Sequence, residues 1–202
     1  MIVSHQHRFI FIKTSKTAGT SLEVFLAGLC GPDDIVTPIF PAVPGHLPRN
    51  HAGCYNHMTG AEVRTLVGVA VWRDYFTFCV ERNPWDKVIS HWSMERHRAE
   101  GNLTLDQYLT VGRFPLNHPK YTEPQDPTRI MVNRIIRFED LDRGIGEMTQ
   151  QIGLPFPGTL EPRMKSEYRT DRRPYHEVLD RRQATIITDT FATEIRLHGY
   201  TY

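Results

Sequence analysis

The sequence of 202 residues predicts an α/β fold with a P-loop-like, three-layer arrangement: a central, mostly parallel sheet flanked by helices. The apolar run Phe9–Ile12 breaks into a small, polar loop, and a helical pattern begins near Thr20. The run Tyr75–Glu81 similarly ends in a turn at which Pro84 can start a helix. Because strand and helix signals alternate in this way, we expect parallel strands with helices over both faces.

The middle of the chain alternates irregular segments with helix starts. Gly31–Gly53 contains five prolines and is expected to be a long, irregular segment, and such loops tend to be functional or mobile. Thr59–Glu62 has the pattern of a capping box that opens a helix to about Val67, and Thr104–Gln107 repeats that pattern. Lys120–Thr128 is Pro-rich and is predicted to be a connection poor in strands.

The last third of the chain supplies one more strand and more helix. Arg134–Phe138 is predicted to be a later strand of the sheet, followed by a helix over about Asp140–Ile152. Leu154–Glu167 is expected to be a loop. Tyr175–Leu197 is predicted to be helical and to end at Gly199, since glycine is favoured just beyond a helix.

Composition favours one globular domain spanning residues 1–202, with 40% apolar and 23% charged residues. A net charge of +1 disfavours nucleic acid as a partner, and the chain lacks an apolar stretch of about 18 residues that could span a membrane. The first residues lead directly into a strand without room for a signal peptide, which predicts a cytoplasmic location. Three cysteines without CxxC spacing indicate neither a disulfide framework nor a zinc site.

The loop Lys13–Gly19 has the composition of an anion site. It carries two lysines and several hydroxyls, and Thr20 and Ser21 lie at the following helix N-terminus, where unpaired N–H groups and the helix dipole attract anions. The loop differs from a Walker A motif because Lys16 precedes the glycine, which disfavours an ATPase. The structural alternative is an ordinary strand-to-helix turn whose polar side chains are solvated.

Arg82 and Ser90 form a second candidate anion site. Arg82 follows the Tyr75–Glu81 run directly, and Ser90 lies about two helical turns further on. A guanidinium and a hydroxyl that converge at the end of a strand can hold a phosphate. Taken alone, the Arg-Asn-Pro turn is more often a capped helix start.

Together these segments resemble the PAPS-dependent sulfotransferases, in particular the branch of carbohydrate sulfotransferases and small bacterial relatives. Lys16–Ser21 is similar to the 5′-phosphosulfate loop of that family, and Arg82-Asn-Pro with Ser90 is similar to its 3′-phosphate site. Ser15 is a departure, since the family usually has proline before the loop lysine. Further similarity lies in Asn56–Glu62, Ile135–Leu141, Lys165–Arg169 and Phe191–Tyr200.

The resemblance implies transfer of a sulfuryl group from PAPS to an acceptor hydroxyl, with carbohydrate favoured as acceptor, PAP as product and no metal required. Lys16 would stabilise charge on the bridging oxygen, Arg82 and Ser90 would hold the 3′-phosphate, and Lys13 would add a cation near the loop. The implied cofactor-binding residues are Lys13, Ser15, Lys16, Thr17, Ala18, Gly19, Thr20, Ser21, Arg82, Ser90, Lys165, Ser166 and Arg169.

Such a reaction needs a base for the acceptor hydroxyl, and His57 is the first candidate. It precedes a predicted helix and lies in the segment similar to a histidine-bearing part of the resembled branch. His46 and His51 are alternatives, while Glu62 is a weaker candidate that the helix cap would use. The structural alternative for His57 is a solvated or internally paired side chain. The remaining histidines that we expect at the surface are His5, His7, His97, His118, His176 and His198.

A different class of function remains open: a P-loop-type nucleotide-binding protein or a kinase without sulfotransferase activity. A kinase needs acidic magnesium ligands, and Asp74 and Asp86 could serve, although neither directly follows a strand. Segments 31–53 and 112–128 are expected to shape the pocket for the acceptor.

Overall fold

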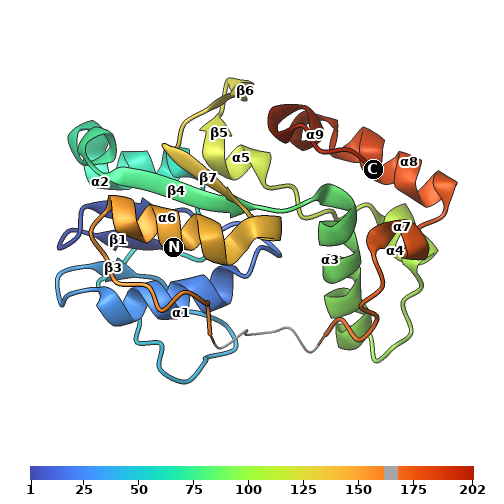
Figure 1. Ribbon diagram of the computed structural model, residues 1–202, viewed down its shortest axis with the longest axis horizontal. Helices are drawn as coiled ribbons and strands as arrows, with labels where there is room; N and C mark the ends of the chain where they lie inside the picture. Colours follow the sequence, from blue (N-terminus) through green and yellow to red (C-terminus); the bar gives the residue numbers. More distant parts are fainter. Residues whose placement is uncertain (162–167) are drawn as a thin grey trace.

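The computed structural model describes residues 1–161 and 168–202 and has an α/β fold (Figure 1). In the described residues the main sheet has five strands in the order β3-β1-β2-β4-β7. Strands β2, β4 and β7 pair in parallel, whereas β1 is antiparallel to both of its neighbours. The sheet is therefore mixed, and the prediction of a mostly parallel sheet is wrong. The strand bounds are β1 Ile2–Ser4, β2 Phe9–Phe11, β3 Ile35–Val36, β4 Phe76–Glu81 and β7 Arg134–Arg137.

The antiparallel part of the sheet comes from two short strands that the hydrophobic pattern did not reveal. Strands β1 and β2 are joined by only four residues, a link that is too short for a parallel crossover. Arg8, with φ of 53°, completes this reversal, and Val3 pairs with Ile10. Strand β3 lies inside the Pro-rich segment and pairs Val36 with Ile2. A strand of two residues is too short to give an alternation signal.

Helices cover both faces of the sheet because successive side chains of a strand point to opposite faces, and the strands carry apolar side chains on both. On one face α1 (Gly19–Leu29) and α6 (Leu141–Gln151) pack over the sheet, and on the other lie α2 (Gly60–Asp74) and α5 (His118–Tyr121). The first face buries Phe9, Phe11, Phe78 and Val80 against Leu22, Leu26, Ile145 and Met148. The second face buries Ile10, Ile12 and Cys79 with Met58, Val63 and Tyr121.

Both predicted capping boxes are confirmed. Thr59 and Glu62 open α2, and Thr104 and Gln107 open α4 (Leu105–Val111). Helix α2 continues beyond the predicted end to Asp74, although Gly68 breaks its regular geometry with φ of 81°. The strand near 134–138 and the helix near 140–152 are also confirmed, as β7 and α6, with the short 3₁₀ helix η1 (Phe138–Asp140) between them.

A third cluster of helices lies beyond the carboxyl end of β4, to which the arrowhead of β4 points in Figure 1. It comprises α3 (Pro84–Arg98) and α4 with the helices of the tail, and buries residues such as Trp85, Ile187 and Phe191. The tail is helical as predicted and ends at Gly199 with φ of 62°, but it is not continuous, because Asp180 starts a new capping box. Its helices are α7 Tyr175–Val178, α8 Arg181–Thr190 and α9 Ala192–His198.

The prediction that Lys120–Thr128 is poor in strands is wrong. Strands β5 (Thr122–Glu123) and β6 (Asp126–Ile130) form a separate two-stranded sheet. Every residue of β6 is exposed, so the strand lacks the alternation of apolar and polar residues from which strands are predicted. Within residues 1–161 and 168–202, none of the helices is long and apolar enough to cross a membrane.

Candidate functional site

The loop between β2 and α1 has an unusual backbone. Lys16 and Ala18 adopt left-handed conformations, with φ of 62° and 56°. Ala18 is the N-cap of α1 and has no side-chain oxygen that could cap the first turn. At Gly19 a Cβ would approach Lys13 Cγ to 2.9 Å and the Thr14 carbonyl oxygen to 3.3 Å. The close approach of loop and helix therefore requires glycine there.

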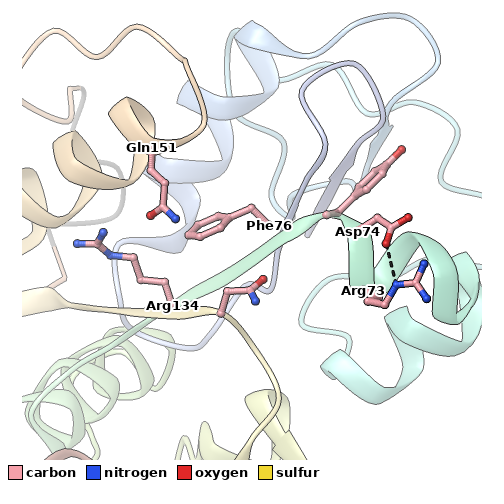
Figure 2. A pocket seen from close by; sticks show the side chains of 7 residues that line it. Arg73, Asp74, Phe76, Arg134 and Gln151 are labelled. Atoms are coloured by element: carbon pink, nitrogen blue, oxygen red, sulfur yellow. Dashed lines mark hydrogen bonds and ion pairs between the residues drawn. The ribbon is translucent and has the colours of Figure 1, made fainter.

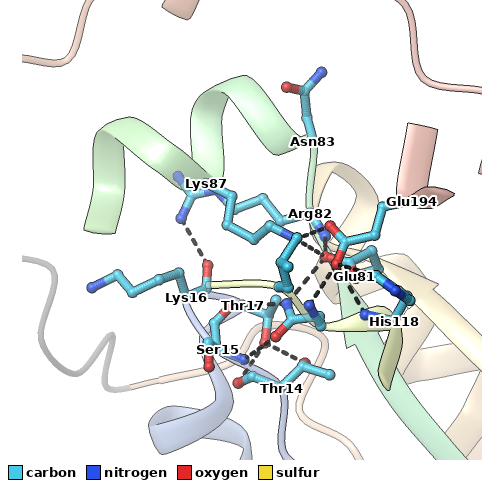
Figure 3. A network of polar contacts seen from close by, with 12 residues as sticks. Thr14, Ser15, Lys16, Thr17, Glu81, Arg82, Asn83, Lys87, His118 and Glu194 are labelled. Atoms are coloured by element: carbon cyan, nitrogen blue, oxygen red, sulfur yellow. Dashed lines mark hydrogen bonds and ion pairs between the residues drawn. The ribbon is translucent and has the colours of Figure 1, made fainter. Parts of the chain in front are cut away.

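Buried and partly buried hydrogen bonds fix this loop to its surroundings (Figure 3). The Thr14 hydroxyl donates to the carbonyl of Val80 on β4, and the hydroxyls of Thr14 and Thr17 lie 2.8 Å apart. The Asn117 side chain accepts from the Ser15 N–H at 2.8 Å and donates to the Ser15 carbonyl at 3.1 Å. The loop is thus held by β4 on one side and by α5 on the other.

Arg82 joins the loop to the carboxyl end of β4. Its Nη1 donates to the Lys16 carbonyl at 3.0 Å, and its Nε donates to Asp86 at 2.8 Å. The guanidinium also lies 4.0 Å from the ring centroid of Phe138. Pro84 begins α3 as predicted, with the Asn83 side chain capping its first turn. Two segments that are 66 residues apart in the sequence therefore meet at one edge of the sheet.

Asp86 holds two guanidinium groups together. It pairs with Arg82 at 2.6 Å and also with Arg169. Burial alone would raise the pKa of Asp86, but the Arg82 and Arg169 charges lower it, so the carboxylate stays ionised. Ser90 lies one turn beyond Asp86 on the partly exposed side of α3. The ion-paired group of Arg82, Asp86 and Arg169 carries a net positive charge of one.

The side chains of Lys16 and Lys13 lie in different environments. The Lys16 ammonium is 3.5 Å from the Met94 sulfur, one turn beyond Ser90 on α3. Lys13 is buried, and its ammonium pairs with Glu23 of α1 at 2.6 Å. The structure thus brings Lys16, but not the Lys13 ammonium, alongside α3. Thr20 and Ser21 lie in the first turn of α1, as the sequence indicates.

His57 contacts the first residue of the same loop. Its Nδ1 lies 2.9 Å from the Lys13 carbonyl oxygen. A carbonyl oxygen can only accept, so Nδ1 carries the proton and Nε2 of the neutral ring presents a lone pair. Burial lowers the pKa of His57 to about 4, and the nearby Lys13 and Lys120 charges act in the same direction. The ring is therefore neutral at pH 7 and can accept a proton at Nε2.

The other candidate bases are placed differently. His46 is 8% exposed, and its Nε2 lies 2.8 Å from the Thr37 carbonyl, while His51 is half-buried. Glu62 serves the α2 cap and also accepts from Tyr55. His7, His118 and His198, expected at the surface, are half-buried instead; burial lowers the pKa of His198 to about 4. Lys165 and Ser166 lie outside the described residues.

A buried charge network at the carboxyl end of β4 was not predicted from the sequence (Figure 3). The Lys87 ammonium contacts Glu81 at 2.8 Å and also Glu194, and all three side chains are fully buried. Glu81 additionally accepts from the Arg82 N–H at 2.8 Å. Burial raises the pKa of Glu81. Burial would also raise the pKa of Glu194, but the Lys87 charge and the hydrogen bonds that Glu194 accepts together lower it. Because α9 is more than 100 residues from β4, no local pattern could have indicated this pairing.

The opposite end of the sheet holds an open pocket of about 600 Å³ (Figure 2). It is lined by Phe76 and Arg134 at the amino ends of β4 and β7, with Gln151 and the Arg73–Asp74 pair nearby. In α/β proteins with parallel strands, ligands usually bind at the carboxyl ends of those strands instead. In the described residues we find no group of three or more histidine, cysteine or acidic side chains arranged to hold a metal ion.

No established protein-family profile matches the chain. A protein of Archaeoglobus fulgidus is 33% identical over 96 residues, which make up 46% of this chain and 80% of that protein. The chain belongs to the same family as this archaeal protein. The relative is described only as an uncharacterized protein, so its description supplies no activity, substrate or cofactor.

Proposed function

We propose that the protein is a PAPS-dependent sulfotransferase, a transferase that moves a sulfuryl group from PAPS to an acceptor hydroxyl and releases PAP. The observation that carries the proposal is the hydrogen bond from Arg82 to the Lys16 carbonyl, which unites the two segments that resemble nucleotide-binding parts of that family. On this interpretation the loop between β2 and α1 is P-loop-like, and binding takes place at the carboxyl edge of the sheet.

The donor would use both anion sites. The uncapped first turn of α1 and the loop N–H groups suit the 5′-phosphosulfate, which is an anion at a helix N-terminus. Arg82, Ser90 and Arg169 suit the 3′-phosphate, since their net charge stays positive after pairing with Asp86. Lys16 is half-buried and contacts both regions: its carbonyl accepts from Arg82, and its ammonium lies beside Met94 of α3.

Sulfuryl transfer would depend mainly on positioning and charge stabilisation. The acceptor oxygen attacks sulfur, its proton passes to Nε2 of His57, and the bond from sulfur to the bridging oxygen breaks. Lys16 stabilises the charge that develops on that oxygen as PAP leaves. A ring held by the Lys13 carbonyl is already in the tautomer that this step needs.

Turnover with PAPS and a panel of acceptors tests the proposal. Formation of PAP that depends on an added acceptor, carbohydrates first, is the expected result, and Lys16→Ala should abolish it in a folded protein. If PAPS and PAP fail to bind while ATP binds, the protein is instead a P-loop-type nucleotide-binding protein or kinase. A cytoplasmic location remains part of the proposal.

A further inference from the structure

We propose that Asn117 is a positioning residue that fixes the loop 13–18 and joins it to the Arg82 end of β4. Asn117 lies at the start of α5 and is fully buried. Its side chain makes two hydrogen bonds to one loop residue, since Oδ1 accepts from the Ser15 N–H and Nδ2 donates to the Ser15 carbonyl. An amide side chain thereby pairs with Ser15 as a neighbouring strand would.

The loop needs such support because its backbone is strained. Lys16, with φ of 62°, follows Ser15 directly, and left-handed backbone is unfavourable for a residue with a side chain. Asn117 Nδ2 donates to the Ser15 carbonyl of the peptide before Lys16, and Arg82 donates to the Lys16 carbonyl. The unfavourable conformation persists because both sides of it are fixed.

Asn117 also connects the loop to the second anion site. Its Nδ2 lies 3.2 Å from Glu81 Oε1, the same oxygen that accepts from the Arg82 N–H and from Lys87. The Asn117 N–H in turn donates to Glu194 of α9. Through Asn117 the loop is therefore tied to the strand end from which Arg82 emerges, so the spacing of the two anion sites becomes a fixed property of the fold.

The expected effect on PAP binding rests on the proposed function. The claim that Asn117 fixes the loop does not. Ser15 can make the hydrogen bond to Asn117 Oδ1 because it has a backbone N–H, which a proline at this position would lack. In the unliganded protein, the Ser15 amide should therefore exchange slowly although it lies outside every helix and strand. An unprotected Ser15 amide in the wild-type protein would overturn the proposal without any substitution.

Asn117→Ala provides the direct test, with Asn133→Ala as its matched control. Asn133 also accepts from a backbone N–H, that of Thr77 at 2.7 Å, but near the amino end of β4. Asn117→Ala should speed amide exchange over residues 13–18 about tenfold, the effect of losing a typical hydrogen bond, and should weaken PAP binding by a similar factor. Exchange in α6 should not change.

Asn133→Ala should alter neither loop exchange nor PAP affinity, whatever it does to thermal stability. The proposal is wrong if Asn117→Ala leaves loop exchange or PAP affinity at the wild-type value, or if Asn133→Ala changes both equally. A wild-type protein that does not bind PAP would contradict the proposed function, whereas the exchange comparison would still decide whether Asn117 fixes the loop.

Discussion

Replacing Lys87 with methionine should destabilise the protein severely at neutral pH. The two side chains have similar volume, so the main loss is the ammonium, which contacts Glu81 at 2.8 Å and also Glu194. Both carboxylates are fully buried and would then lose the one ammonium that contacts both of them. Breaking a buried pair in this way costs about 3–5 kcal/mol. For a chain of this size, that corresponds to a fall in Tm of roughly 6–20 °C.

The pH dependence distinguishes this charge effect from simple loss of packing. Burial already raises the pKa of Glu81, and removal of Lys87 raises it further above the unfolded value of about 4.3. The folded variant then binds more protons than the unfolded chain, so its stability relative to wild type increases as the pH falls. The deficit should be largest above pH 7 and should shrink between pH 7 and pH 5.

Chemical denaturation at pH 7.5 and pH 5 measures both effects, with Arg64→Met as the control. Arg64 pairs with Glu123 through bonds of 2.8 and 3.0 Å, but the side chains are 31% and 20% exposed, so the variant should lose less than about 1 kcal/mol. If Lys87→Met loses no more than Arg64→Met, or if its deficit is the same at both pH values, the interpretation of the network is refuted.

The remaining predictions concern the site. Lys16→Ala should fold normally and lose on the order of 10²–10³ in turnover, and near-normal PAPS-dependent activity would remove Lys16 from the mechanism. His57→Ala should lower kcat by about 10²–10⁴ with little change in PAP affinity. The acidic limb of the wild-type kcat/KM profile should lie near pH 4, where His57 titrates, and should disappear in that variant; an unchanged profile would assign the base elsewhere. Gly19→Ala should lower Tm because the new Cβ meets Lys13 and Thr14, and an unchanged Tm would show that the loop can move away.

Local signals in the sequence were sufficient for several elements of the fold. The capping boxes at Thr59 and Thr104 and the helix start at Pro84 depend on residues within one turn, and all three occur as predicted. The antiparallel strands β1 and β3 were missed because a few residues carry no periodicity. Their pairing depends on tertiary contacts that propensity does not encode.

In the candidate site, too, some features follow from local sequence patterns and others depend on tertiary contacts. Arg82 at the end of β4 and the loop before α1 could be placed from strand and helix patterns, because the carboxyl ends of neighbouring parallel strands meet at one edge. Asn117 could not, since it contacts Ser15 across 102 residues. The Lys13 ammonium was expected near the phosphate, but the sequence did not reveal that buried Glu23 would pair with it.

Calorimetric titration with PAP and AMP, on the wild-type protein and on Arg82→Ala, tests the central claim most directly. The two ligands differ in the 3′-phosphate, which the account assigns to Arg82, Ser90 and Arg169. A charge-assisted hydrogen bond contributes roughly 1.5–3 kcal/mol, so the wild-type protein should bind PAP at least about tenfold more tightly than AMP, and Arg82→Ala should lose about ten- to hundredfold in PAP affinity alone. Equal affinity of the wild-type protein for PAP and AMP, or an equal loss for both ligands in Arg82→Ala, would contradict the account.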